Sequence, residues 1–186
     1  MYRKAYLQIW WGLLFLLISF RVQGIDLLPD FIGYVLLFLG FRALVSLHIC
    51  FRTAMFMTVL SVIYRVALTV ILPGSEEGKP ILSYPLTPFL ESIQTIFHFL
   101  IIYTMYQAIC SVAKMQGSLD FAQKLEGAQK ILLYAFLAVA FTSPLLPHSV
   151  DGIVALLFIP QLIFIFCCLY SLILVRLAAR QSAISK

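Results

Sequence analysis

Six long apolar runs, separated by short segments rich in Gly, Pro and charged residues, constrain this sequence more than any other feature. The runs are Tyr6–Phe20, Phe31–Leu47, Ala54–Leu72, Phe89–Val112, Ile131–Leu146 and Ile153–Val175. A helix needs about 20 mostly apolar residues to cross the hydrocarbon core of a bilayer, and these runs are of roughly that length. We therefore predict an all-α protein, a polytopic transmembrane bundle of six helices that forms a single integral membrane domain over residues 1–186.

The composition excludes most other classes of protein. Of the 186 residues, 62% are hydrophobic and 11% are charged, and the mean hydropathy is +1.01. Soluble domains are about 45–50% apolar and about 25% charged. A soluble globular domain, a disordered chain, a coiled coil and a small disulfide scaffold are all excluded. The four cysteines show no Cys-x-x-Cys or His/Cys spacing, so we expect reduced thiols without a metal role.

The distribution of charge predicts the orientation of the bundle. Ten of the thirteen Lys and Arg residues fall on one side of the six runs: Arg3, Lys4, Arg42, Arg52, Lys114, Lys124, Lys130, Arg176, Arg180 and Lys186. Six of the eight acidic residues fall on the other: Asp26, Asp30, Glu76, Glu77, Glu91 and Asp151. The positive-inside rule then places both termini in the cytoplasm. It also explains the net charge of +5 without a nucleic-acid partner. Residues 114–130 are expected to be a connecting loop. It is either a plain linker or one whose segment 118–126 forms a short interfacial helix or a docking point for a partner.

Polar residues within the third and fourth runs form two stripes at helical spacing. The third run carries Thr58, Ser61, Arg65 and Thr69, and the fourth carries Glu91, Gln94, Thr95 and His98. A charged side chain inside the membrane is costly, so it is expected to face protein or water. We predict that the two stripes face each other and that Arg65 pairs with Glu91. Such a pair could be purely structural, could belong to a ligand site, or Arg65 could reach the lipid headgroups instead.

Two predicted outer hairpins carry further polar residues. Asp26 and Asp30 flank Pro29 ahead of the second run, and His148 and Asp151 follow Pro147 ahead of the sixth. Either carboxylate of the first hairpin could cap the following helix, and His148 and Asp151 suit a hydrogen-bonded pair or a helix cap. Neither hairpin supplies enough ligands for a metal site. We predict no metal and no cofactor.

The first hairpin resembles one found in small six-helix membrane proteins of Gram-positive bacteria. The shared form is Ile-Asp-x-Leu-Pro-Asp-x-Ile-Gly-Tyr, which here spans residues 25–34. The resemblance implies a bacterial plasma-membrane setting and no particular activity. In size and helix number the chain also looks like the substrate-binding subunits of energy-coupling-factor transporters, an analogy of architecture alone.

Three functions remain open on these grounds. The first is a small-solute binding or transport component, with a polar site open to the outer face built from Asp30, Arg65, Glu91 and His98, and with Asp26, His148 and Asp151 as further candidates. The second is a non-catalytic partner that scaffolds or regulates another membrane complex. The third is an intramembrane enzyme, although no known nucleophile or metal motif is present and we assign no catalytic residue. The expected partners are the lipid bilayer, a small polar ligand from the outer side and another membrane protein.

Overall fold

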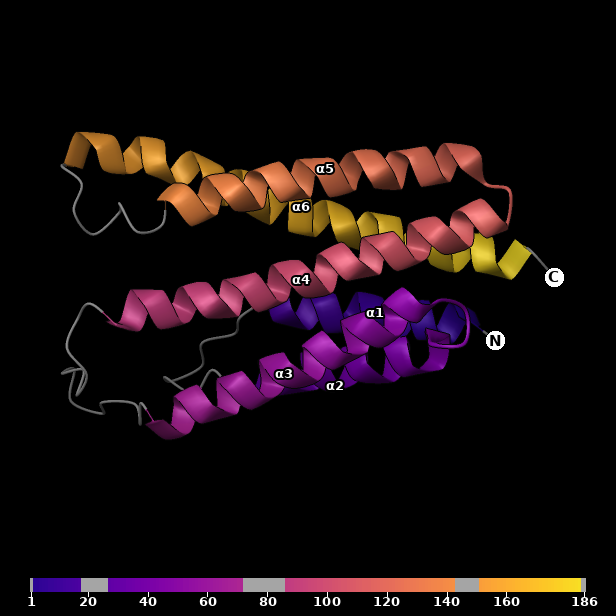
Figure 1. Ribbon diagram of the computed structural model, residues 1–186, viewed down its shortest axis with the longest axis horizontal. Helices are drawn as coiled ribbons and strands as arrows, with labels where there is room; N and C mark the ends of the chain where they lie inside the picture. The colour runs from indigo at the N-terminus through magenta and orange to yellow at the C-terminus, as the bar shows by residue number, and fades with distance from the viewer. Residues whose placement is uncertain (1, 18–26, 72–85, 143–150, 185–186) are drawn as a thin grey trace.

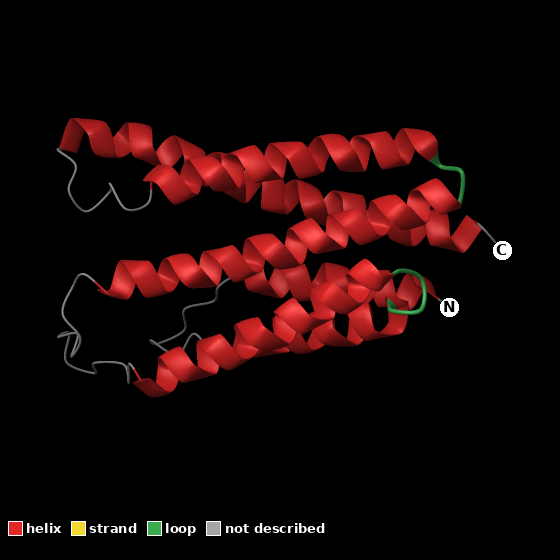
Figure 2. Cartoon of the chain, in the orientation of Figure 1, coloured by secondary structure: helices red, strands yellow, loops and turns green. Residues whose placement is uncertain are grey.

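Six helices account for the described part of the chain in the computed structural model (Figures 1 and 2). The structure describes residues 2–17, 27–71, 86–142 and 151–184, with side chains at 2–17, 31–67, 93–141, 159 and 162–181. The helices are α1 (Tyr2–Leu17), α2 (Leu27–Leu44), α3 (Ile49–Ile71), α4 (Leu86–Met115), α5 (Leu119–Thr142) and α6 (Asp151–Ile184). These residues contain no strand, so the predicted all-α class with six helices is confirmed.

The helices run antiparallel in chain order and form a closed ring. Each helix contacts the next one along the chain, and α6 contacts α1. The start of α1, the end of α6 and the α2–α3 and α4–α5 connections lie at one end of the bundle (Figure 1). This end of the bundle, with the adjoining half of each helix, is called the basic half below.

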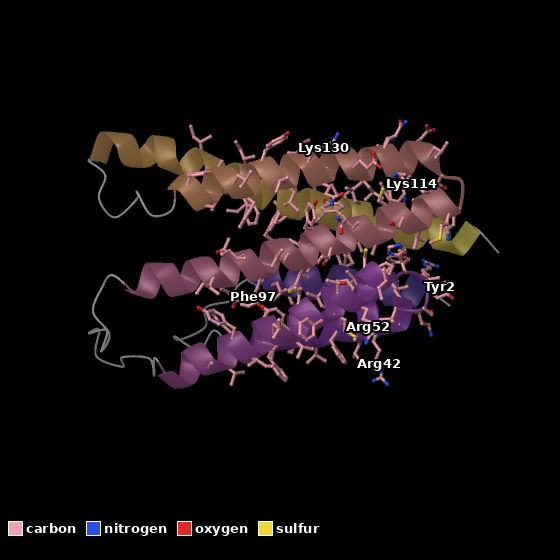
Figure 3. All side chains as sticks on the ribbon, in the orientation of Figure 1. Tyr2, Arg42, Arg52, Phe97, Lys114 and Lys130 are labelled. Carbon is pink, nitrogen blue, oxygen red and sulfur yellow. The ribbon has the colours of Figure 1, made fainter. Side chains whose placement is uncertain are left out.

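Nine exposed Lys and Arg side chains give the basic half its name. They are Arg3, Lys4, Arg42, Arg52, Lys114, Lys124, Lys130, Arg176 and Arg180. Figure 3 shows Arg42, Arg52 and Lys114 around the chain ends. Within the described residues, Arg65 is the one cation in the other half.

Glycine allows α1 and α2 to pack closely. A Cβ atom on Gly12 would lie 2.8 Å from the carbonyl oxygen of Gly33, and one on Gly40 would lie 2.9 Å from the carbonyl oxygen of Ala5. These distances leave no room for a side chain, so the two backbones approach each other where small residues face one another.

The outer surface of the bundle is apolar, and three helices are suited to crossing a membrane. Phe56, Phe141 and Phe166 have exposed fractions of 57%, 77% and 68%, which is unfavourable for surfaces that face water. Ile49–Ala67, Ile93–Met115 and Leu162–Gln181 are long and apolar enough to span a bilayer, and Phe31–Leu44 is a shorter apolar helix. Three of the six predicted spans thus satisfy this criterion within the described residues.

The prediction of a plain linker over residues 114–130 is wrong, whereas the alternative of a helix at 118–126 is confirmed in part, since this segment is the start of α5. Helix α4 continues to Met115 and α5 already begins at Leu119, and Gly117 makes the turn between them with a φ of 75°. The start of α5 is helical because it is amphipathic. Phe121, Ala122, Leu125 and Ala128 are buried against the core, whereas Lys124 and Gly127 face outward.

Candidate functional site

A buried cluster of polar side chains connects α2, α3 and α4. It consists of Tyr34, Ser61, Gln94 and His98, and we call it the polar network. The Tyr34 hydroxyl oxygen lies 2.6 Å from Nε2 of His98 and 2.9 Å from Oγ of Ser61. The Gln94 amide nitrogen donates to the Tyr34 hydroxyl and lies 3.0 Å from Oγ of Ser61. The exposed fractions of Tyr34, Ser61 and Gln94 are 2%, 0% and 8%, so these side chains bond to one another rather than to bulk water. The amide oxygen of Gln94 is buried without a hydrogen-bond partner among the described residues.

Nε2 of His98 faces two groups that can donate a proton. It lies 2.6 Å from the Tyr34 hydroxyl oxygen and 3.2 Å from the Gln94 amide nitrogen. In the neutral tautomer that carries its proton on Nδ1, Nε2 accepts from these donors. The described hydrogen bonds of His98 involve Nε2, which leaves Nδ1–H of that tautomer as a donor.

The two polar stripes predicted from the sequence do face each other across α3 and α4. The hydrogen bond from Gln94 to Ser61 joins them directly. Thr58 is turned into its own helix instead, where its hydroxyl donates to the carbonyl oxygen of Ala54 at 2.8 Å. Arg65 is half-buried and lies close enough to His98 to interact with it electrostatically.

The remaining predicted site residues fall where the structure gives no side chain. Asp26 and His148 lie outside the described residues, and Glu91, Asp30 and Asp151 are described only as helical backbone. Asp30 lies in the first turn of α2, and Asp151 is the first residue of α6. The pairing of Arg65 with Glu91 therefore stays a prediction.

A cavity of about 110 Å³ adjoins the polar network at His98 and lies between α1, α4 and α6. We call it the His98 cavity. Its wall is mainly apolar, formed by residues such as Leu13, Leu17, Ile102 and Phe164, and its polar contributors are His98 and Ser171. The Ser171 hydroxyl donates to the carbonyl oxygen of Cys168 at 2.5 Å, so its oxygen can still accept a hydrogen bond. Among the side chains that the structure describes, none that lines this cavity is charged.

This arrangement differs from the polar site expected from the sequence. Between α3 and α4 the described polar side chains bond to one another, and the cavity that adjoins them has an apolar wall. Of the predicted site residues, His98 lines this cavity and Arg65 does not. The sequence analysis missed Tyr34 and Ser171. Each is a hydroxyl within an apolar helix, and such a group normally has a buried partner, which was the available signal.

A second polar contact joins α4 to α5 in the basic half. Nζ of Lys114 lies 2.5 Å from Oε1 of Glu126, and Sγ of Cys110 lies 3.7 Å from the same oxygen. The hydrogen bond and the charge of Lys114 lower the pKa of Glu126. Both charged groups are partly exposed, so this pair is an ordinary surface contact.

Metal binding finds no support in the side chains at hand. Within the described ranges, no three His, Cys, Asp or Glu residues lie close enough to hold a metal ion.

Comparison of the whole chain with protein-family models, with curated proteins and with solved structures gave no match.

Proposed function

We propose that this protein is a multi-pass protein of the bacterial plasma membrane that binds a small neutral solute in the His98 cavity. In this proposal all six helices span the bilayer and both termini are cytoplasmic. Three long apolar helices and the apolar outer surface support the membrane setting. The nine exposed cations in one half of the bundle support the orientation.

The observation that carries the binding function is the double role of His98. Nε2 of the ring contacts the polar network, and the same residue lines a mainly apolar cavity. The contacts of Nε2 hold the ring in place, and in this proposal Nδ1–H is the donor that meets the ligand. Small-molecule sites typically combine an apolar wall with a few fixed polar groups of this kind.

The wall of the cavity defines the class of ligand. Because its described lining residues carry no charge, a charged ligand would lose its hydration without compensation from them. The volume of about 110 Å³ is somewhat below the roughly 150 Å³ of a cavity that holds benzene. We infer a ligand with a small apolar body and one hydrogen-bond acceptor, such as a carbonyl oxygen.

Cys168 lines the same cavity and offers a direct readout of binding. The probes are cyclopentanone and cyclopentane, which differ by the carbonyl acceptor, and the measurement is their protection of Cys168 against alkylation in lipid nanodiscs. The protein carries Ser in place of Cys50, Cys110 and Cys167. We expect saturable protection by cyclopentanone, with weaker protection by cyclopentane at equal concentration in the bilayer.

Two variants test the two parts of the proposed site. His98→Phe should abolish the preference for the carbonyl compound, and Ser171→Leu should fill the cavity and abolish protection by both probes. Thr95→Ala, on the same helix but outside the cavity wall, serves as the control and should behave like the parent. If neither probe protects Cys168 in the parent, the proposed binding function is wrong.

A further inference from the structure

A second cavity lies closer to the end of the basic half and is also bounded by α1, α4 and α6. It has a volume of about 80 Å³ and is lined by Tyr2 and Tyr6 of α1, Ile109 and Gln116 of α4, and Ala178 and Gln181 of α6, with additional residues from the neighbouring elements. We call it the Tyr6 cavity. Its polar side chains are hydroxyls and amides, and none of its lining residues in the described part of the chain is charged.

The two cavities are in register along all three helices. On each helix the nearest lining residues of the two cavities are seven positions apart: Tyr6 and Leu13, Ile102 and Ile109, and Ser171 and Ala178. Seven residues of a helix rise about 10 Å and complete almost two turns, which returns the side chain to the same face. The cavities are therefore stacked along one axis through the bundle, about 10 Å apart.

A single layer of apolar side chains separates them. Ile9, Met105 and Val175 lie on the lining faces, three or four residues from the cavity residues on either side, and each has an exposed fraction of 0%. We call these three residues the separating layer. Helices α1 and α4 make no close backbone contact within the described residues, so side chains alone fill the space between them at this level.

The Tyr106 side chain adds a polar contact beside this layer. It is almost completely buried and interacts with Ser171, which lines the His98 cavity. Its neighbour Met105 belongs to the separating layer. A methionine side chain has three rotatable bonds and adapts readily to a new shape, so it can be displaced at a lower cost than a branched residue.

We propose that the separating layer is a gate, through which the neutral solute of the His98 cavity exchanges with the basic half by way of the Tyr6 cavity. This proposal rests on the proposed binding function and deepens it by naming the route. A neutral solute suits both cavities, because each combines an apolar wall with uncharged hydrogen-bonding groups. A gate of one layer also explains why a cavity lies on each side of the separating layer while the three residues of that layer are completely buried.

The accessibility of Cys168 from the basic half tests the gate. The full-length protein, with Cys168 as its single cysteine, is studied in sealed membrane vesicles of both orientations. The probe is 2-hydroxyethyl methanethiosulfonate, a small neutral reagent that suits the cavities. It is added on one side of the vesicles, and glutathione on the other side consumes any reagent that crosses the bilayer. A parallel protein with Ser46→Cys, in the exposed α2–α3 connection, identifies the vesicles whose basic half faces the reagent.

We expect Met105→Ala to raise the rate of Cys168 modification from the basic half by about tenfold or more, because loss of a buried methionine weakens local packing by more than the equivalent of a factor of ten. Val175→Ala removes less volume and should give a smaller increase, which keeps the test available if Met105→Ala fails to fold. The matched control is Leu132→Ala. Leu132 is equally buried, at 0%, but it lies on α5 and lines neither cavity, so the rate should change by less than about twofold.

Equal rates for the layer variants and Leu132→Ala would overturn the gate, as would an increase seen only from the opposite side. Protection by cyclopentanone is measured in the same proteins and separates this result from a failure of the binding site. Protection without any effect of the layer variants means that the site exists but the route is wrong. Absence of protection in the parent, with accelerated modification in the layer variants, means that the passage exists but the proposed ligand site is wrong.

Discussion

The Tyr34 hydroxyl and Nε2 of His98 lie 2.6 Å apart, although the two residues are 64 positions apart in the sequence. This contact connects α2 to α4 across the polar face of α3. Because the same hydroxyl accepts hydrogen bonds from Ser61 and Gln94, Tyr34 joins three helices at one atom. The orientation of His98 toward the cavity thus depends on a residue that does not itself line the cavity.

Removal of this hydroxyl should destabilise the bundle. We expect Tyr34→Phe to lower the free energy of unfolding by about 1–3 kcal/mol, because it leaves buried donors without an acceptor while the ring still packs. Thermal unfolding in lipid nanodiscs measures the change. Tyr103→Phe is the control, since Tyr103 is half-buried on α4 and makes ring contact with Phe99 that phenylalanine preserves. Equal effects of the two substitutions would contradict the central role of Tyr34.

A methyl group at Gly12 should disturb the contact between α1 and α2. Its Cβ would lie 2.8 Å from the Gly33 carbonyl oxygen and 2.9 Å from the backbone nitrogen of Leu37, so the helices must move apart. We expect Gly12→Ala to cost about 1–3 kcal/mol of unfolding free energy. Gly127→Ala provides the comparison, because nothing lies within 4 Å of the added atom and alanine favours the helix by up to about 1 kcal/mol. A loss of stability at both positions would argue against close packing as the cause.

The contact between Lys114 and Glu126 should be visible in an acid titration. Since Lys114 lowers the pKa of Glu126, the pair stabilises the folded chain above the pKa of the unfolded carboxyl and loses this effect as the pH falls through the folded-state pKa. We expect Lys114→Met to raise the pKa of Glu126 toward its ordinary value, measured by carbon NMR of labelled glutamate. Lys124→Met, at an exposed position on the other face of α5, should leave the titration almost unchanged. A Glu126 pKa that is the same with and without Lys114 would show that the pair does not persist in solution.

The proposed orientation predicts which positions a thiol reagent reaches in cells. In a cysteine-free background, Ser46→Cys and Gln123→Cys place thiols at exposed positions of the basic half. An impermeant maleimide should label both only after the plasma membrane of spheroplasts has been permeabilised, because the positive-inside rule places this half in the cytoplasm. Labelling in intact spheroplasts would reverse the orientation.

The helical fold could be predicted from the pattern of long apolar runs along the sequence. The six apolar runs correspond to six helices, and the spacing of Ser61 and Gln94 correctly indicated that α3 and α4 face each other. The start of α5 was predicted only as one alternative, a short separate helix, because its charged residues also suggested a loop. In the structure Phe121 and Leu125 bury one face of a helix that continues into the span. Hydropathy averaged over a span does not detect an amphipathic extension of this kind.

The cavity was harder to predict because it depends on which helices become neighbours. His98 was recognised as a polar residue within a span, but its position against Ser171 and Leu13 follows from the contact of α6 with α1. Helix periodicity states which residues share a face and not which distant helix that face meets. Tyr34 was overlooked for a related reason, since a tyrosine in an apolar helix contributes mainly hydrophobic area until its partner is known.

The closed ring also has a consequence for the biogenesis of the protein. Helix α6 leaves the ribosome after the other five helices, and it must then find α1. Until then the α1 face that carries Ile9 and Leu13 has no lasting neighbour on that side. Both cavities depend on this final junction, so a nascent chain that ends before Phe164 would hold the early helices together without any compartment for a guest molecule.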